Sequence, residues 1–354
     1  MNYNECLAAL KKNHQIVRKG ALEICLKPVP ETLEPGTPDP REAHWFRTKP
    51  TGPNIKNPAD LQFAEIHAIR TSMGCVSVDL SHGVTTDIRV IDVEAGALPI
   101  LVYTPQKGTS PKPVVVYIHG GGFFGGSARV IENACKELAD KADTVVVSVD
   151  YDLAPEFKFP RQVYQCYQTV CWVHDHAEEL GIDPQKIAVS GDSAGGNLSA
   201  ACCVMDKDNK FIKLQLLLYP AAFNRSEAEI GWSLDQYDLR TDVDIKMDFI
   251  NDIRNMVPFT GALYVERPEQ VLDPLFSVGD VEDYSCFPRT FIAVGEYDYL
   301  RIQDELFGRK LAEAGIPVRF VVYKGMAHAF WEHTGEFPQA EDCTDEMAAL
   351  VRAL

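Results

Sequence analysis

The sequence predicts an α/β fold, in which helices cover both faces of a mostly parallel sheet. Short, continuously apolar segments alternate with helical patterns from residue 114 onwards. Strands that are apolar along their whole length are typical of parallel sheets buried on both faces. A chain of 354 residues, 46% hydrophobic and 24% charged, is large and apolar enough to build such a core. This composition also excludes a disordered or collagen-like protein.

The first 75 residues differ from the rest of the chain in their residue pattern and proline content. Apolar residues at near-helical spacing predict an amphipathic helix over residues 5–22 and a second helix over residues 61–73. Between these helices, eight of the 22 prolines lie in residues 28–58. Proline lacks a backbone donor and restricts the residue before it, so we expect an irregular arm there. We therefore expect residues 1–75 to form helices and a proline-rich arm that lie over the core as part of a cap.

Residues 76–221 show the alternation that defines the core. The first two strands have a period of two, whereas the later strands are apolar throughout. The expected elements are strands at 84–90, 98–103 and 114–119, a helix at 128–141, a strand at 144–149, a helix at 161–180, a strand at 186–190, a helix at 194–206 and a strand at 213–219.

The alternation breaks between residues 222 and 287. Asp235–Asp252 alone holds six aspartates, and the segment has no strand pattern. We interpret residues 222–287 as an insertion, so that the predicted core consists of residues 76–221 and 288–354. The elements expected in the second part of the core are a strand at 290–294, a helix at 302–314, a strand at 317–323 and a closing helix at 340–354.

The charge balance and the patterning limit the partners. The 34 Lys and Arg against 51 Asp and Glu give a formal net charge of −17, which excludes nucleic acid as a partner because it repels polyanions. No apolar run is long enough to span a membrane, and the N-terminus lacks the charged-then-apolar order of a secretory signal. We expect a cytoplasmic protein whose ten cysteines, with no C-x-x-C pair, are reduced thiols. A homodimer stays open, because nothing in the sequence determines the oligomeric state.

The strongest chemical signal is the run from Gly191 to Gly195, Gly-Asp-Ser-Ala-Gly. This G-x-S-x-G motif directly follows a predicted strand and opens a predicted helix. Small residues on both sides permit the sharp turn that exposes the serine hydroxyl. We infer that Ser193 is a nucleophile and that the N–H of Ala194, at the helix start, stabilises negative charge beside it. The alternative, a tight turn without chemistry, is disfavoured by the position of the motif.

A second signal is an H-G-G-G run, His119 to Gly122, at the end of an apolar strand. Glycines allow the backbone N–H groups of Gly121 and Gly122 to approach an oxygen that becomes charged during reaction. We expect these two N–H groups and that of Ala194 to form an oxyanion hole, with His119 and Gly120 supporting the loop. The alternative is a phosphate loop, but neither G-x-x-x-x-G-K-[ST] nor G-x-G-x-x-G spacing is present.

A serine hydroxyl is a weak nucleophile and needs a base. Glu296 and Asp298 lie on the loop after the predicted strand 290–294, and His328 lies on the loop after the next strand. In serine hydrolases with a G-x-S-x-G turn, the acid follows the serine along the chain and the histidine follows the acid. The two carboxylates and His328 occur in this order. We choose Asp298 and His328, because Glu296 follows the strand end directly, where its longer side chain is expected to bond to the backbone or another loop. The chain has no H-E-x-x-H motif, and we expect neither a metal nor a cofactor.

Taken together, these motifs resemble those of the hormone-sensitive lipase family of esterases. The resemblance covers roughly residues 76–354, and it implies an α/β-hydrolase fold with a helical cap built from the N-terminal segment and the 222–287 insertion. It also implies cofactor-free hydrolysis of small-molecule esters by a serine, usually with short to medium acyl chains. The motifs that carry it are His119-Gly-Gly-Gly-Phe123, Tyr151-Asp-Leu-Ala-Pro-Glu156, Gly191-Asp-Ser-Ala-Gly-Gly-Asn197, Gly295-Glu-Tyr-Asp298 and Gly325-Met-Ala-His328-Ala-Phe330.

The sequence departs from the family at two positions. Family members commonly have arginine where this chain has Asp152, and proline where it has Tyr299. Neither position performs chemistry, so we expect a serine carboxylesterase that forms an acyl-enzyme. Two other functions stay open, namely an amide or formamide hydrolase that uses the same residues, and a small-molecule binding protein. Phe124, Phe223 and Trp232 are candidates to shape the substrate pocket.

Overall fold

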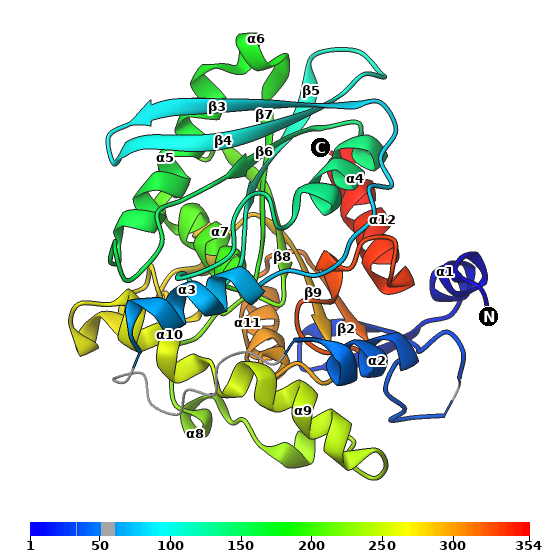
Figure 1. Cartoon of the computed structure of the whole chain (residues 1–354). Helices are drawn as coiled ribbons and strands as arrows, with labels where there is room; N and C mark the ends of the chain where they lie inside the picture. Colours follow the sequence, from blue (N-terminus) through cyan, green and yellow to red (C-terminus); the bar gives the residue numbers. More distant parts are fainter. Residues whose placement is uncertain (33, 51–60) are drawn as a thin grey trace.

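One mixed sheet runs through the centre of the protein (Figure 1). The computed structural model describes residues 1–32, 34–50 and 61–354, and within them ten strands form this sheet in the order β1-β2-β10-β9-β8-β7-β5-β6-β4-β3. The seven strands from β2 to β6 in that order are parallel, whereas β1, β4 and β3 are antiparallel to their neighbours. The strands are β1 (Gln15–Lys19), β2 (Leu22–Lys27), β3 (Val84–Val93), β4 (Gly96–Pro105), β5 (Lys112–Ile118), β6 (Val145–Val149), β7 (Ile182–Asp192), β8 (Ile212–Leu218), β9 (Arg289–Gly295) and β10 (Val318–Tyr323).

Helices surround this sheet, which confirms the predicted α/β architecture. α12 packs on both α4 and α1, whereas α5 and α7 pack on each other and α11 covers β2, β9 and β10. In Figure 1, α1, α4 and α12 lie to the right of the sheet and α5 and α7 to its left. These helices are α1 (Tyr3–Lys12), α4 (Glu132–Ala142), α5 (Arg161–Asp175), α6 (Ala177–Leu180), α7 (Ala194–Met205), α11 (Arg301–Glu313) and α12 (Pro338–Arg352).

The core lies at the centre of the parallel strands. The valines Val114–Val116 of β5 and Val145–Val147 of β6 are almost fully buried. β-Branched side chains pack well on a pleated sheet that is covered on both faces, and their burial holds the strands in register. All ten cysteines are free thiols, and seven of them are buried.

The N-terminal segment departs from the helix expected over residues 5–22. α1 ends at Lys12, and residues 15–27 form the hairpin β1–β2, with Gly20 at a φ of 61° in the turn. In β2, Leu22 and Ile24 are buried and Glu23 between them is exposed, which is the period of a strand. Because β2 pairs with β10, this part of the chain belongs to the central sheet and not to a cap.

The proline-rich arm is not irregular throughout. α2 (Pro40–Thr48) forms within it, with Asp39 as its N-cap and Pro40 in the first turn, where a missing backbone donor costs little. The helix expected over 61–73 is confirmed as α3 (Phe63–Ser72). Part of the expected arm, residue 33 and residues 51–60, lies outside the described residues.

Residues 222–287 form helices and turns without a strand, as the broken alternation predicts. α9 packs on α2, and Figure 1 shows α8, α9 and α10 with α2 and α3 in the lower part of the molecule. No helix in the described ranges is long and apolar enough to cross a membrane. The helices of this segment are α8 (Glu227–Ile230), α9 (Val243–Arg254) and α10 (Val257–Tyr264), with 3-10 turns at Leu234–Gln236, Pro268–Leu272, Val278–Asp280 and Tyr284–Cys286; a further 3-10 turn, Phe330–Glu332, precedes α12.

Candidate active site

Ser193 stands in the sharp turn between β7 and α7. Its φ of 52° and ψ of −116° are rare for a residue with a side chain, and such a conformation costs about 1–3 kcal/mol. The turn passes close to β5, because a Cβ on Gly195 would come within 2.0 Å of the Ile118 carbonyl oxygen. A Cβ on Gly191 would approach the Gly195 carbonyl oxygen within 2.4 Å. Only glycine fits on either side of the serine, which explains the G-x-S-x-G pattern.

The glycine loop after β5 has a backbone that larger residues rarely adopt. Gly121 and Gly122 have φ values of 110° and 62°. A Cβ on Gly121 would lie 2.3 Å from the carbonyl oxygen of Gly125, and one on Gly122 would lie 2.9 Å from the Phe124 ring. Because the carboxyl ends of parallel strands meet at one edge, this loop and the serine turn lie beside each other.

Asp192 joins the glycine loop to the serine turn, a link that the sequence reasoning did not identify. Its Oδ1 accepts hydrogen bonds from the Gly120 N–H (2.9 Å) and the Tyr117 hydroxyl (2.8 Å). A Cβ on Gly120 would lie 2.2 Å from Asp192 Oδ2, so glycine is required there too. The side chain is fully enclosed, and burial raises the pKa of the Asp192 carboxyl. The carboxylate thereby fixes the loop relative to Ser193.

His119 lies behind the loop. Its ring stacks on Tyr151 at 4.2 Å between ring centres, and Tyr151 donates a hydrogen bond of 2.9 Å to the His119 carbonyl oxygen. The Nδ1 of His119 lies 2.8 Å from the Gly120 carbonyl oxygen, which fits an Nδ1–H donor. Burial lowers the pKa of His119, so the ring is neutral near pH 7. A neutral ring in this position suits support of the loop.

Asp298 and His328 form a buried pair. The Nδ1 of His328 lies 2.7 Å from Asp298 Oδ2, and Asp298 is fully buried. The other carboxylate oxygen, Oδ1, accepts the Leu300 N–H at 2.8 Å. The Tyr237 hydroxyl donates to the Asp298 carbonyl oxygen at 3.0 Å. Each carboxylate oxygen therefore has one defined partner, which fixes the orientation of the imidazole.

Glu296 faces a different loop. Its Oε2 accepts the backbone N–H of Gly325 at 2.9 Å, and its Oε1 pairs with Lys324. Both partners lie in the turn that leads from β10 to His328. The side chain thus bonds to the backbone of a neighbouring loop, as expected from its place at the strand end.

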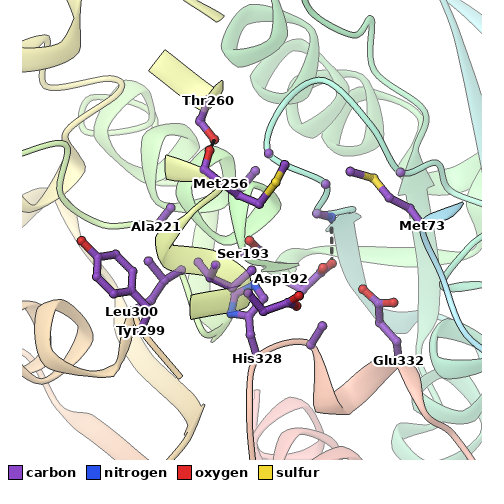
Figure 2. Close-up of a pocket in the computed structure, with 18 of the residues that line it drawn as sticks. Met73, Asp192, Ser193, Ala221, Met256, Thr260, Tyr299, Leu300, His328 and Glu332 are labelled. Carbon is purple, nitrogen blue, oxygen red and sulfur yellow. Dashed lines mark hydrogen bonds between the residues drawn. The ribbon is translucent and has the colours of Figure 1, made fainter. Parts of the chain in front are cut away.

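One cavity of about 710 Å³ brings the predicted site residues together (Figure 2). Ser193 and His328 line it, and Asp298 lies behind the histidine. Phe124 and Phe223 line it as well, whereas Trp232 packs behind Tyr299 at 5.2 Å between ring centres. The other predicted site residues that line the cavity are His119, Gly120, Gly121, Gly122 and Ala194. Within residues 1–32, 34–50 and 61–354, no group of three or more His, Cys, Asp or Glu side chains is arranged to hold a metal ion.

Arg70 of α3 is a further contact that no sequence pattern indicated. Its Nη2 donates to the Ala154 carbonyl oxygen at 2.7 Å, its Nε donates to that of Phe124 at 2.5 Å, and its guanidinium pairs with Glu156 at 2.6 Å. A helix from the N-terminal segment is thereby tied to the glycine loop. Arg70 and these partners lie 54 or more residues apart in the chain, so no local sequence motif links them.

The two departures from the family pattern have structural explanations. Asp152 accepts hydrogen bonds from Arg161 (2.6 Å) and Gln165 (2.8 Å), so the acid has a local partner at the start of α5. Tyr299 lines the cavity, and its hydroxyl lies 3.3 Å from a Glu227 oxygen. The tyrosine therefore shapes the pocket, although it takes no part in the acid–histidine pair.

Two family models match the chain. Residues 115–332 match a family described as having the α/β-hydrolase fold, and residues 66–157 match a carboxylesterase family. The first match includes Ser193, Asp298 and His328, and extends over more than half of the chain.

Named relatives and solved structures agree with these matches. An arylesterase of Saccharolobus solfataricus is 35% identical over 249 residues, which are 70% of this chain and 77% of the relative. A carboxylesterase of Mycobacterium tuberculosis is 34% identical over 263 residues, 73% of this chain and 79% of the relative. A solved arylesterase structure is 30% identical, covers 89% of this chain and 98% of its own, and has a TM-score of 0.74.

Proposed function

The chain belongs to the hormone-sensitive lipase family of α/β-hydrolases, and on that premise we propose that Ser193, His328 and Asp298 hydrolyse carboxylic esters through an acyl-enzyme. The protein is a hydrolase that acts on ester bonds, as its named relatives are. The observation that supports the proposed residues is their arrangement. A partly exposed serine, a glycine loop and a histidine oriented by a buried carboxylate all meet in one cavity.

In the proposed mechanism, His328 is the general base. It takes the proton from Ser193, whose oxygen attacks the ester carbonyl, and then gives that proton to the leaving alcohol. Asp298 accepts a hydrogen bond from Nδ1 and so holds the tautomer with a free Nε2. Its negative charge also stabilises the imidazolium that forms. Water, activated by the same histidine, then releases the acid from the serine.

The charge of the tetrahedral intermediate would be stabilised by the N–H groups of Gly121, Gly122 and Ala194. The first two lie in the loop that Asp192 fixes, and the third opens α7, whose dipole favours negative charge. Because these donors are held before the substrate binds, they need little reorganisation during reaction.

The expected substrate size and the cap are part of the same proposal. We infer that α2, α3 and residues 222–287 form the cap, because their side chains, including Trp45, Ile69 and Met256, line the cavity. A cavity of about 710 Å³ fits short to medium acyl chains.

We also propose that the protein is cytoplasmic and that it forms a homodimer. Cell fractionation tests the location, and light scattering of the purified protein tests the oligomeric state.

Labelling with an organophosphate tests the nucleophile. Such a reagent phosphorylates an activated serine, because the serine oxygen attacks phosphorus and displaces the leaving group of the reagent. We therefore expect one equivalent of label on the peptide that contains Ser193 and a loss of activity in proportion to labelling. Peptide mass spectrometry locates the label. A label on any other peptide would contradict the assignment of the nucleophile.

Matched esters and anilides decide between the two kinds of hydrolysis. Esters have the better leaving group, and we expect them to be cleaved while the anilides of the same acids react far more slowly. Faster cleavage of the anilides would favour an amide hydrolase, and binding without turnover of either would favour a binding protein. Initial rates at equal substrate concentrations make the comparison.

Gly122→Ala should lower kcat by roughly 10²–10³ with a smaller effect on KM, because oxyanion donors act mainly in the transition state. The added Cβ would meet the Phe124 ring at 2.9 Å, so the loop must shift. Gly315→Ala is the matched control, since Gly315 also has a positive φ, 82°, but nothing within 4 Å of the new Cβ. Steady-state kinetics of both variants measure the effect. An unchanged kcat for Gly122→Ala would mean that the loop is only a turn.

A further inference from the structure

Glu332 is a cavity residue to which the proposed mechanism gives no role. It lies four residues beyond the proposed base, at the end of the 3-10 turn before α12, and is partly buried. It lines the same cavity as Ser193. Figure 2 shows Glu332 and Met73 on one side of the serine and Tyr299 on the other. Glu332 therefore faces one of the two directions in which a bound ester can extend from the nucleophile.

The carboxylate of Glu332 has no counter-ion in the described part of the chain. Among the residues that the structure describes, none donates a hydrogen bond to this carboxylate or forms an ion pair with it. Of the lysines and arginines that line the cavity within residues 1–32, 34–50 and 61–354, Lys49 pairs with Asp252 at 2.8 Å and Arg225 with Asp280 at 2.8 Å. Ionising a partly buried carboxyl group without a partner is costly, so a positive group from outside the chain would stabilise the charged form of Glu332.

The charges around Glu332 favour a cation as that partner. Burial and the negative charge of Asp192 raise the pKa of Glu332 to about 8. A positive group beside the carboxylate would offset the cost of burying its charge and the repulsion by Asp192. It would therefore favour the ionised form of Glu332. The net charge of −17 also attracts cations toward the molecule as a whole.

The other neighbours of Glu332 suit a weakly hydrated cation. Met73 and Cys75 line the same cavity, and both carry polarizable sulfur atoms. Burial, followed by the charge of Glu332, raises the pKa of Cys75, so the thiol is neutral and does not compete as a charged group. The sulfur of Met73 packs against Gly125, where a Cβ would come within 2.3 Å of it. Methylated ammonium groups fit such a lining because they need few hydrogen bonds.

We propose that Glu332 is a specificity residue that selects esters carrying an ammonium group on the side of the cavity where Met73 lies. The inference rests on the proposed function, because it assigns a substrate class to the same cavity. The ammonium group can belong to the alcohol part or to the acyl part of the ester, and the chemistry that recognises it is the same.

Two pairs of isosteric esters test the proposal. In each pair one ester ends in a trimethylammonium group and the other in a neutral tert-butyl group, placed on the alcohol chain in one pair and on the acyl chain in the other. We expect the ammonium ester of at least one pair to have a kcat/KM about tenfold or more above that of its neutral partner. Glu332→Gln should reduce that ratio to within about threefold of one, because the amide keeps the shape and loses the charge. The pair that responds identifies the part of the substrate beside Glu332.

Glu336→Gln is the matched control. Glu336 is exposed and lines a neighbouring hollow instead of the active-site cavity, yet the substitution removes the same charge. This variant should keep the preference of the parent protein, which separates a local effect of Glu332 from a change in net charge.

The preference should increase as the pH rises through the pKa of Glu332, because only the ionised carboxylate attracts a cation. Other groups in the cavity titrate as well, but their effects on catalysis are common to both esters of a pair and cancel in the ratio. Among the described residues, the other titratable groups that line the cavity are Lys49, Cys75, His119, Asp192, Arg225, Asp248, Asp252, Tyr299, His328 and His333.

Equal kcat/KM values within both pairs, or a preference that survives in Glu332→Gln, would overturn the inference. In either case turnover of the neutral esters by the parent protein leaves the proposed function standing. Failure of the parent protein to hydrolyse any of the four esters or simpler acyl esters would instead contradict the proposed function itself.

Discussion

Ser193→Ala is expected to lower kcat by about 10⁶-fold, the scale seen when a catalytic serine is removed from a hydrolase of this type. The substitution removes the attacking oxygen and leaves the turn unchanged, because the backbone hydrogen bonds of residue 193 to Leu218, Asn197 and Ala221 do not involve its hydroxyl. The positive φ is as unfavourable for serine as for alanine, so stability should change little. Ester turnover and the melting temperature of the variant measure the two effects.

Ser199→Ala provides the control on the same helix. The Ser199 hydroxyl is buried and donates to the Gly195 carbonyl oxygen at 2.8 Å, away from the cavity. Its loss should cost about 1 kcal/mol of stability and leave kcat within about tenfold of the parent. If Ser193→Ala also kept kcat within about tenfold of the parent, Ser193 would not be the nucleophile.

Asp298→Asn is expected to lower kcat by at least about 10², and by as much as about 10⁴, the loss known for the same change in a serine protease. The structure explains why an amide is harmful. The Leu300 N–H donates to one oxygen of Asp298, so the amide oxygen of asparagine would remain there and its NH₂ group would face His328 Nδ1. The histidine would then carry its proton on Nε2, which is the nitrogen that must accept the serine proton.

Glu296→Gln is the comparison that assigns the acid. The amide oxygen can still accept the Gly325 N–H, and only the ion pair with Lys324 weakens. We expect a loss of less than about tenfold in kcat, because that ion pair lies outside the cavity. If the two variants show the opposite order of activity, the acid is Glu296, while Ser193 and His328 keep their roles.

The site could be predicted where the chemistry constrains the backbone locally. The turn at Ser193 admits only glycine at positions 191 and 195, and the loop at Gly121 admits no Cβ, so both leave a pattern in consecutive residues. The order of Asp298 and His328 along the chain follows from the order of the parallel strands that precede them. These features can be recognised in the sequence because each depends on a few neighbouring residues.

Features that depend on contacts between distant segments were missed. β1 is exposed along most of its length and therefore has no apolar alternation, although it pairs with β2 residue by residue. Arg70 reaches the Phe124 carbonyl oxygen from 54 residues away, and no short motif encodes such a contact. The position of Trp232 behind Tyr299 likewise depends on how residues 222–287 fold over the sheet. The spacing of apolar residues predicts which residues share a helix or strand, whereas side-chain packing determines which helices and strands contact each other.

The hairpin at the N-terminus determines where this protein can be shortened. The family match runs from residue 115 to residue 332, and β1 to β4 all lie before residue 115. A chain trimmed to the match would leave β10 without β2 and β6 without β4, so two apolar strands would present unpaired backbone groups to solvent. Such open edges recruit strands from other molecules and promote aggregation. The strands before the matched region therefore cover the sheet edges that would otherwise promote aggregation, in addition to extending the sheet.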